Sequence, residues 1–128
     1  AGIYRKESGR STAYRHDVAE PAAISYQLRR LVARVKTEGD ASHAISTACR
    51  IHRALIAIFP FNQDNGIIAR LAMNTWLLRH GYPPAIIHIR DRQRYWDSYL
   101  SDNGAFKRLV IDSIMGSLNA RIGLMAAA

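Results

Sequence analysis

The chain has 128 residues, enough for one domain with a hydrophobic core, and we expect a single domain over residues 1–128, excised from a longer chain. Hydrophobic residues make up 48% of the chain, which excludes a disordered polymer, and apolar runs such as those at 54–59 and 85–87 are too short for a membrane span. The net charge of +8 permits an acidic protein or nucleic acid as partner, but the charge is mostly Arg scattered along the chain, so nucleic-acid binding is the less favoured interpretation.

The N-terminal segment, residues 1–18, has no helical stripe and is rich in Arg, Ser and Gly. Two short mixed segments on either side of Gly9 predict a small β-hairpin. Arg5, Arg10 and Arg15 fall in this segment and would suit a protein partner of acidic character. The alternative is a solvated hairpin whose charged edge prevents aggregation.

The first two predicted helices follow this segment. Pro21 opens the first helix at a position where its missing N–H does no harm, and Gly39 is the expected C-terminal cap. The second helix begins near 41–42, and its apolar stripe runs from Ala44 to Ile58 at helical spacing. Pro60 ends it, because proline cannot donate to a helix and restricts the residue before it.

Three further helices are predicted, so the fold class is all-α. The third helix begins near residues 65–66, and its expected inner face consists of Ile68, Leu71, Ala72, Thr75 and Trp76. An extended or irregular link at 85–90 leads to a fourth helix at 91–100. The apolar residues expected to be buried in the last helix are Phe106, Leu109, Val110, Ile114, Leu118 and Ile122.

The turn "PFNQDNG", residues 60–66, joins the second and third helices and has two physical interpretations. A turn that leads directly into a helix directs free backbone N–H groups and the helix dipole at one point, which predicts an anion site. Gly66 permits close approach to the backbone. Alternatively, the turn is an ordinary corner in which Asn65 caps the next helix.

The stretch "FPFNQDNGIIAR", residues 59–70, resembles the signature of the Fic (Fido) family, H-P-F-x-[DE]-G-N-G-R-x-x-R. The matching residues, in register and without a gap, are Pro60, Phe61, Asn65, Gly66 and Arg70. "AGIYR" at 1–5 and the stretch at 69–96 are also similar to family patterns, so the resemblance covers nearly the whole chain. It implies a Fic-like helical bundle with an N-terminal hairpin, the flap, that holds a target segment by strand addition. The family's activity is AMP transfer from ATP to a protein hydroxyl.

Four positions depart from the signature. Phe59 stands where the family has its catalytic His, and a phenyl ring cannot act as a general base. Gln63 replaces the carboxylate that holds Mg²⁺, and Ile67 replaces the first Arg, which grips phosphate. Asp64 replaces a Gly and adds a negative charge beside the anion site, although it could also serve as a displaced metal ligand. We therefore expect no catalytic residue and no metal site.

The adenosine side of the family site is better kept. The resemblance implies that Trp96 stacks on adenine and that Asn103 contacts its edge, in addition to Asn65, Gly66 and Arg70 at the anion site. The alternative is that Trp96 is an ordinary packing residue. We expect no certain cofactor, and only weak binding of ATP with Mg²⁺. His52, on the helix before the turn, is predicted to be a packed, hydrogen-bonded residue behind it.

Three functions follow in order of preference. The first is a degenerate Fic domain, inactive or nearly inactive as an AMP transferase, that acts as a binding or regulatory module. The second is an active nucleotidyl or phosphoryl transferase with a rearranged site. The third is a basic nucleic-acid-binding helical domain. Because its lone cysteine, Cys49, forms no internal disulfide, we expect a cytoplasmic protein.

Overall fold

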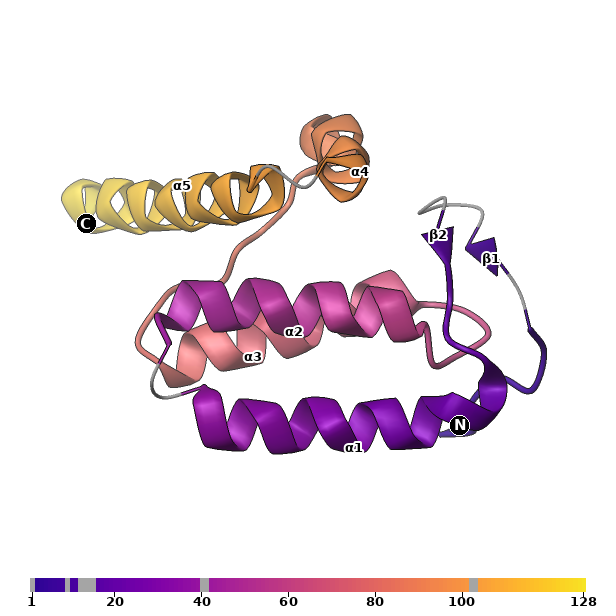
Figure 1. Cartoon of the computed structure of the whole chain (residues 1–128). Helices are drawn as coiled ribbons and strands as arrows, with labels where there is room; N and C mark the ends of the chain where they lie inside the picture. The colour runs from indigo at the N-terminus through magenta and orange to yellow at the C-terminus, as the bar shows by residue number, and fades with distance from the viewer. Residues whose placement is uncertain (1, 9, 12–15, 40–41, 102–103) are drawn as a thin grey trace.

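The computed structural model describes all residues except 1, 9, 12–15, 40–41 and 102–103 (Figure 1). Within that part of the chain the fold is helical with a small N-terminal hairpin, as predicted. The elements in chain order are β1 (Arg10–Ser11), β2 (His16–Asp17), α1 (Pro21–Glu38), α2 (Ala44–Ile58), α3 (Asn65–Arg79), the 3-10 helix η1 (Ile89–Asp91), α4 (Arg92–Leu100) and α5 (Ala105–Ala127). The strands pair antiparallel, with Arg10 opposite Asp17 and Ser11 opposite His16.

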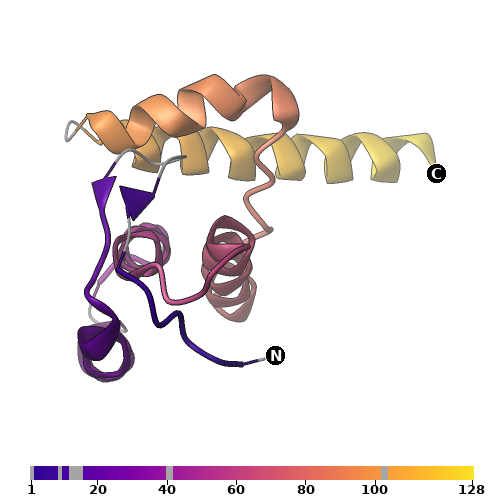
Figure 2. The same cartoon turned by 90° about the vertical axis from the view of Figure 1, so that its right-hand side faces the viewer.

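Helix α2 is the centre of the bundle. It contacts α3 along its length, and α1 and α5 also pack on it (Figure 1). Helices α4 and α5 contact each other and lie on the side of α2 away from α1 (Figures 1 and 2). The hairpin stands near the end of α2 where the loop to α3 begins, and His16 of β2 is bonded to the carbonyl of Ile56 there. The arrangement therefore gathers the hairpin and the α2–α3 loop at one end of the molecule.

The prediction of which residues form the inner face of α3 was wrong. The structure buries Ala69, Met73 and Leu77, whereas Leu71 is 66% exposed. Helix α3 carries apolar residues on most of its sides, so periodicity does not select a face. Packing against α2 selects it, helped by the Trp76 indole N–H, which donates a 3.1 Å hydrogen bond to the carbonyl of Ala44.

Helix α5 is buried only in its first half. Phe106, Leu109, Val110 and Ile114 are in the core as predicted, but Ile122 is 62% exposed, which corrects that part of the prediction. The second half extends past α2 and α3 (Figure 2). By length and apolar composition, α5 is the one helix among the described residues that is long and apolar enough to cross a membrane, and 17% of its most apolar stretch is buried in the structure.

Gly39 follows α1, where a C-terminal cap was predicted, but not in the left-handed conformation typical of capping glycines. Its φ is −60°, and its N–H donates to the carbonyl of Val35. A Cβ at this position would lie 2.6 Å from Cη2 of Trp76. Gly39 is therefore required by the close packing of the α1 end on α3.

Candidate functional site

The loop between α2 and α3 is bounded by two residues in the left-handed backbone conformation. Phe59 caps the C-terminus of α2 with φ 49°, and Asp64 precedes α3 with φ 64°. They are the non-glycine residues with positive φ in the described part of the chain. This conformation is unfavourable for residues with a Cβ, and it persists where surrounding contacts enforce it, often at functional sites.

Asn65 holds the loop closed. Its Oδ1 accepts a 2.9 Å hydrogen bond from the N–H of Phe61, and its Nδ2 donates a 2.8 Å bond to the carbonyl of Phe61. The side chain is 3% exposed, so it is committed to the loop. What Asn65 can offer a ligand is its backbone N–H, which, with those of Gly66 and Ile67, has no acceptor inside α3.

The prediction that Arg5 is one of the cations of the flap was wrong. It is 6% exposed and lies before the hairpin. Its guanidinium donates to the carbonyls of Phe59 (2.6 Å), Ile58 (3.3 Å) and Ala19, and its backbone N–H donates to the carbonyl of Pro60 (2.9 Å). Carbonyls at a helix C-terminus lack intrahelical donors, so a buried guanidinium satisfies them. Arg5 fixes the start of the loop and does not face a partner.

A cavity of about 630 Å³, the motif cavity, opens beside the loop and brings together most of the predicted site. The predicted residues that line it are Phe59, Asp64, Asn65, Gly66, Ile67, Arg70 and Trp96. Three other motif residues are outside the lining. Pro60 is buried, Phe61 is half-buried with its ring centroid 5.9 Å from that of Tyr4, and Gln63 is exposed. The motif thus divides into residues that build the loop and residues that face the cavity.

The rest of the cavity wall was missed by the sequence analysis. It consists of Ile87, His88, Ile89, Arg92 and Tyr95. The segment before η1 is held in place by Asn74, which accepts a 2.8 Å bond from the N–H of Ala85 and donates a 3.3 Å bond to its carbonyl. The available signal was the dense Arg and His pattern of "IIHIRDR", residues 86–92, shortly before the aromatic pair Tyr95-Trp96.

Arg70 enters the cavity from α3 and rests on Tyr95. Its guanidinium carbon lies 5.6 Å from the centroid of the Tyr95 ring, and its Nη1 donates to the Tyr95 hydroxyl at 3.4 Å. The Tyr95 hydroxyl is also bonded to Nε2 of His52, at 3.1 Å. Contacts of cations with aromatic faces are attractive. Arg70 is therefore positioned by a chain of contacts that ends in the core.

His52 is the buried end of that chain, and its predicted packed, hydrogen-bonded state is confirmed. It is fully buried, with the Tyr99 hydroxyl bonded to Nδ1. Burial, followed by the positive charges of Arg70 and Arg53, lowers the pKa of His52 to about 3. A neutral imidazole therefore supports Tyr95 at all physiological pH values, and this histidine does not exchange protons with the cavity.

The donor set fits Mg²⁺ poorly. Asp64 is the carboxylate among the lining residues, and it is exposed at the mouth. In the described part of the chain, no three His, Cys, Asp or Glu side chains gather where they could hold a metal ion. Two guanidinium groups, those of Arg70 and Arg92, face the same cavity. The lining of the cavity thus carries two guanidinium groups and one carboxylate.

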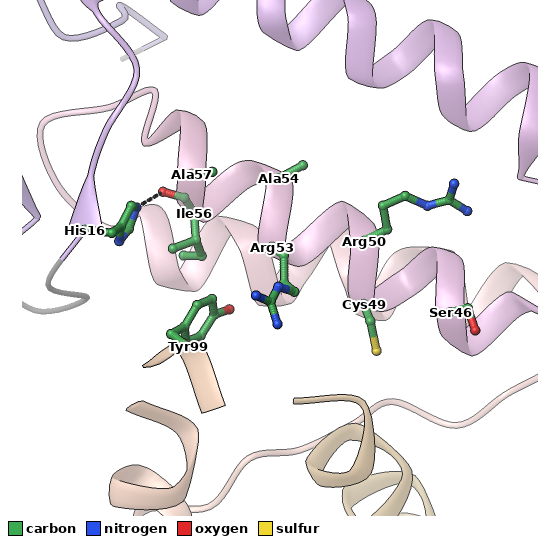
Figure 3. A pocket seen from close by; sticks show the side chains of 9 residues that line it. All are labelled: His16, Ser46, Cys49, Arg50, Arg53, Ala54, Ile56, Ala57 and Tyr99. Carbon is green, nitrogen blue, oxygen red and sulfur yellow. Dashed lines mark hydrogen bonds between the residues drawn. The ribbon is translucent and has the colours of Figure 1, made fainter. Parts of the chain in front are cut away.

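A second cavity, of about 620 Å³, lies on another side of α2 and shares no lining residue with the first (Figure 3). Arg53 of α2 points toward the ring of Tyr99 there, with the guanidinium carbon 5.9 Å from the centroid. His16 packs edge-on against Phe59, at 6.4 Å between ring centroids, and its Nε2 is bonded to the carbonyl of Ile56 at 2.9 Å. The imidazole nearest Phe59 by these contacts thus lines the second cavity and not the motif cavity.

Two predicted site residues, Asn103 and Arg15, lie outside the described residues. Arg10 is in β1, and its side chain is not described. The adenine contact predicted for Asn103 and the flap roles predicted for Arg10 and Arg15 therefore stay predictions.

Comparison with known proteins agrees with this geometry. Residues 1–77 match the Fic/DOC family. The protein adenylyltransferase Fic of Aedes aegypti is 46% identical over 55 residues, 43% of this chain and 11% of the relative. The protein adenylyltransferase fic-1 of Caenorhabditis briggsae is 33% identical over 113 residues, 82% of this chain and 22% of the relative. The chain belongs to the Fic/DOC family.

Solved structures show the same fold. Fic-1 (residues 134–508) from C. elegans superimposes with a TM-score of 0.86 at 28% identity, over 99% of this chain and 38% of that chain. A Fic domain-containing signaling protein from Bacteroides thetaiotaomicron gives 0.80 at 25% identity, over 95% of this chain and 56% of that chain. The chain thus spans only a part of each relative, from 11% to 56% in these cases.

Proposed function

We propose that this chain is a Fic domain that does not transfer AMP and that acts as a binding or regulatory module. The observation that carries the proposal is Phe59. It stands at the position that matches the catalytic His of the family signature, and its ring borders the motif cavity. A phenyl ring accepts no proton, and general-base catalysis typically contributes roughly 10²–10⁴-fold to such reactions.

Two further features support the same conclusion. Ile67, which matches the first signature Arg, is 57% exposed at the cavity and can donate no hydrogen bond to a phosphate. Gln63, which matches the metal-binding carboxylate, is exposed and outside the cavity wall. The motif thus lacks the general base, the first arginine and the metal-binding carboxylate of the family signature. Hydrogen bonds from Arg5 and Asn65 hold its backbone, which includes the left-handed residues Phe59 and Asp64.

The test is incubation of the chain with α-labelled ATP and Mg²⁺, alone and with a model protein target. We expect no covalent label on either protein. An intact Fic domain is the positive control, and the same domain with its signature His replaced by Phe is the matched negative control. Labelling by this chain at a rate near that of the positive control would refute the proposal.

Weak nucleotide binding is part of the proposal. Trp96 supplies a stacking surface, and Arg70 and the N–H groups at the start of α3 supply partners for an anion. Asp64 opposes them, because its carboxylate repels a phosphate, although solvent screens this exposed charge. By calorimetry, ATP should bind weakly with little dependence on Mg²⁺, Asp64→Gly should tighten binding, and Trp96→Ala should abolish it.

A protein partner at the hairpin is proposed as the ligand of the module. Strands β1 and β2 form a two-stranded sheet, so each has an edge that an extended segment could join. The chain's net charge of +8 favours an acidic partner. Arg5, being buried, is not part of this surface. Deletion of residues 9–15, which keeps His16 against Phe59, should remove partner binding without changing nucleotide binding, which calorimetry measures separately.

A second candidate function is a transferase with a rearranged site. The observation in its favour is that Asp64 and Arg70 line one cavity, where a carboxylate could hold a metal and a guanidinium a phosphate. Tight, Mg²⁺-dependent ATP binding that is lost in Asp64→Asn would favour this candidate. Weak binding that strengthens in Asp64→Asn would favour the first proposal.

A further inference from the structure

The motif cavity is more apolar than a site for a nucleoside triphosphate requires. Its apolar and aromatic wall is made of Phe59, Ile67, Ile87, Ile89 and Trp96, with the Tyr95 ring behind Arg70. These side chains come from the loop, α3, the segment at 87–89 and α4, so several elements contribute to the lining. Such a wall favours an apolar or aromatic ligand body, because burial of apolar surface is the main source of affinity there.

The charge facing the cavity is small and positive. Arg70 and Arg92 carry two positive charges, Asp64 carries one negative charge, and His88 is the remaining titratable side chain besides Tyr95. With a neutral imidazole the lining has one net positive charge. A ligand with one negative charge is matched by this lining, whereas a triphosphate brings several charges that no metal and no third cation offset.

The guanidinium of Arg70 is held ready for an anion. The face and the hydroxyl of Tyr95 fix its orientation, and Tyr95 is in turn fixed by His52. A positioned guanidinium offers parallel N–H groups that match the two oxygens of a carboxylate. Little side-chain freedom is then lost on binding.

We propose that the motif cavity binds an aromatic monocarboxylate, with the carboxylate on Arg70 and Arg92 and the ring against Trp96 and the isoleucine wall. This inference rests on the proposed function, since it assumes a site that has lost its triphosphate chemistry. The ligand is defined by its chemistry, a planar apolar ring with one carboxylate. Asp64 limits the charge that the mouth of the cavity accepts.

Calorimetry with three probes tests the ligand class. The probes are naphthalene-2-carboxylate, its neutral analogue naphthalene-2-carboxamide, and ATP with Mg²⁺. The carboxylate should bind about tenfold more tightly than either of the others, the contribution of one charge-assisted pair. Equal affinities for carboxylate and amide, or tighter binding of ATP, would overturn the proposal.

Variants at exposed positions test the residues. Arg92→Gln should weaken the carboxylate about fivefold and leave the amide unchanged, and Asp64→Asn should tighten the carboxylate about threefold, as expected for single charges near the surface. Ile67→Ser should weaken carboxylate and amide alike. The matched control is Arg79→Gln, an exposed Arg at the end of α3 that does not line the cavity. A change of similar size in the control, or none in Arg92→Gln, would contradict the assignment.

The two proposals fail in different ways. Labelling from α-labelled ATP would refute the proposal that the chain does not transfer AMP, but it would not measure the binding of naphthalene-2-carboxylate. The affinity ranking of the three probes refutes or supports the ligand class, whether or not any label is transferred. A chain that neither transfers AMP nor prefers the carboxylate would retain the proposed function and lose this inference.

Discussion

The guanidinium of Arg5 donates a 2.6 Å hydrogen bond to the carbonyl of Phe59, so the N-terminal segment is bonded to the residue that replaces the family's catalytic His. The same side chain reaches the carbonyls of Ile58 and Ala19. These contacts hold the C-terminus of α2 at the position from which the motif loop departs. They fix the backbone where the loop between α2 and α3 begins.

Replacement of Arg5 by Gln should destabilise the fold by about 3 kcal/mol, because several buried carbonyls lose a charged donor. Urea denaturation measures the change. The control is Arg90→Gln, whose side chain is 81% exposed and lies 3.9 Å from Asp91, and which should change the unfolding free energy by no more than about 0.5 kcal/mol. If Arg5→Gln is equally neutral, Arg5 is a surface cation as the sequence first suggested.

The sequence predicted the element order because its boundaries carry local signals. Pro21 starts α1, Pro60 ends the α2 segment, and the Asn65-Gly66 pair starts α3. The inner face of α3 was not predictable in this way, since apolar residues occur around the whole helix and only contact with α2 decides which are buried. The exposed position of Ile122 was missed because periodicity does not tell where a neighbouring helix stops.

The candidate site was predictable where it lies in one continuous motif. The stretch at 59–70 supplied six lining residues, and the aromatic pair of α4 supplied Trp96. His88 and Arg92 could not be assigned from the sequence, because the path of the chain between α3 and α4 depends on Asn74, which clamps Ala85. Arg5 was misassigned because a charged side chain in a basic segment gives no sign of burial.

Gly39→Ala should destabilise the protein by about 1–3 kcal/mol, although the backbone there suits any residue. The new Cβ would be 2.6 Å from Cη2 of Trp76 and would also collide with the carbonyl of Val35. Gly116→Ala is the matched control, since nothing lies within 4 Å of a Cβ there. In a helix interior it should stabilise by about 1 kcal/mol. Thermal unfolding of both variants measures the two changes in stability. If both variants are more stable than the parent chain, Trp76 moves aside freely.

Repair of the motif should require several changes at once. Phe59→His alone should leave the chain without AMP transfer, because the phosphate and metal contacts would still be absent. Phe59→His, Gln63→Asp, Asp64→Gly and Ile67→Arg together should produce measurable labelling from α-labelled ATP, with gains that are not additive, since such groups act as a unit. Strong activity from the single change would show that the other three positions matter little.

Asp64→Gly on its own should affect stability as well as binding. Asp64 has a φ of 64°, a conformation that costs L-residues roughly 1–2 kcal/mol and glycine almost nothing. Glycine also loses more backbone freedom on folding, so the net stabilisation should be at most about 1 kcal/mol. Asp64→Ala, which removes the charge and keeps the Cβ, is the control. If Ala stabilises as much as Gly, removal of the carboxylate and not relief of backbone strain is the cause.

His52 should make the protein less stable in mild acid. Burial, followed by the charges of Arg70 and Arg53, lowers its pKa to about 3 from an ordinary value of 6.5. Its ring is bonded to the hydroxyls of Tyr95 and Tyr99. Between these two pKa values the unfolded chain binds a proton that the folded chain refuses, so the free energy of unfolding falls as the pH falls from about 6.5 toward about 3. From pH 7 to pH 5 the loss from this one group should be about 2 kcal/mol.

The control is His52→Gln, which has no titrating group at this position and shares every other histidine and carboxylate with the parent chain. Urea denaturation should show the variant less stable than the parent at pH 7, with the difference smaller by about 2 kcal/mol at pH 5. A difference that stays constant between the two pH values would mean that the folded state accepts the proton at His52, and that Tyr95 and Arg70 are not supported by a neutral imidazole.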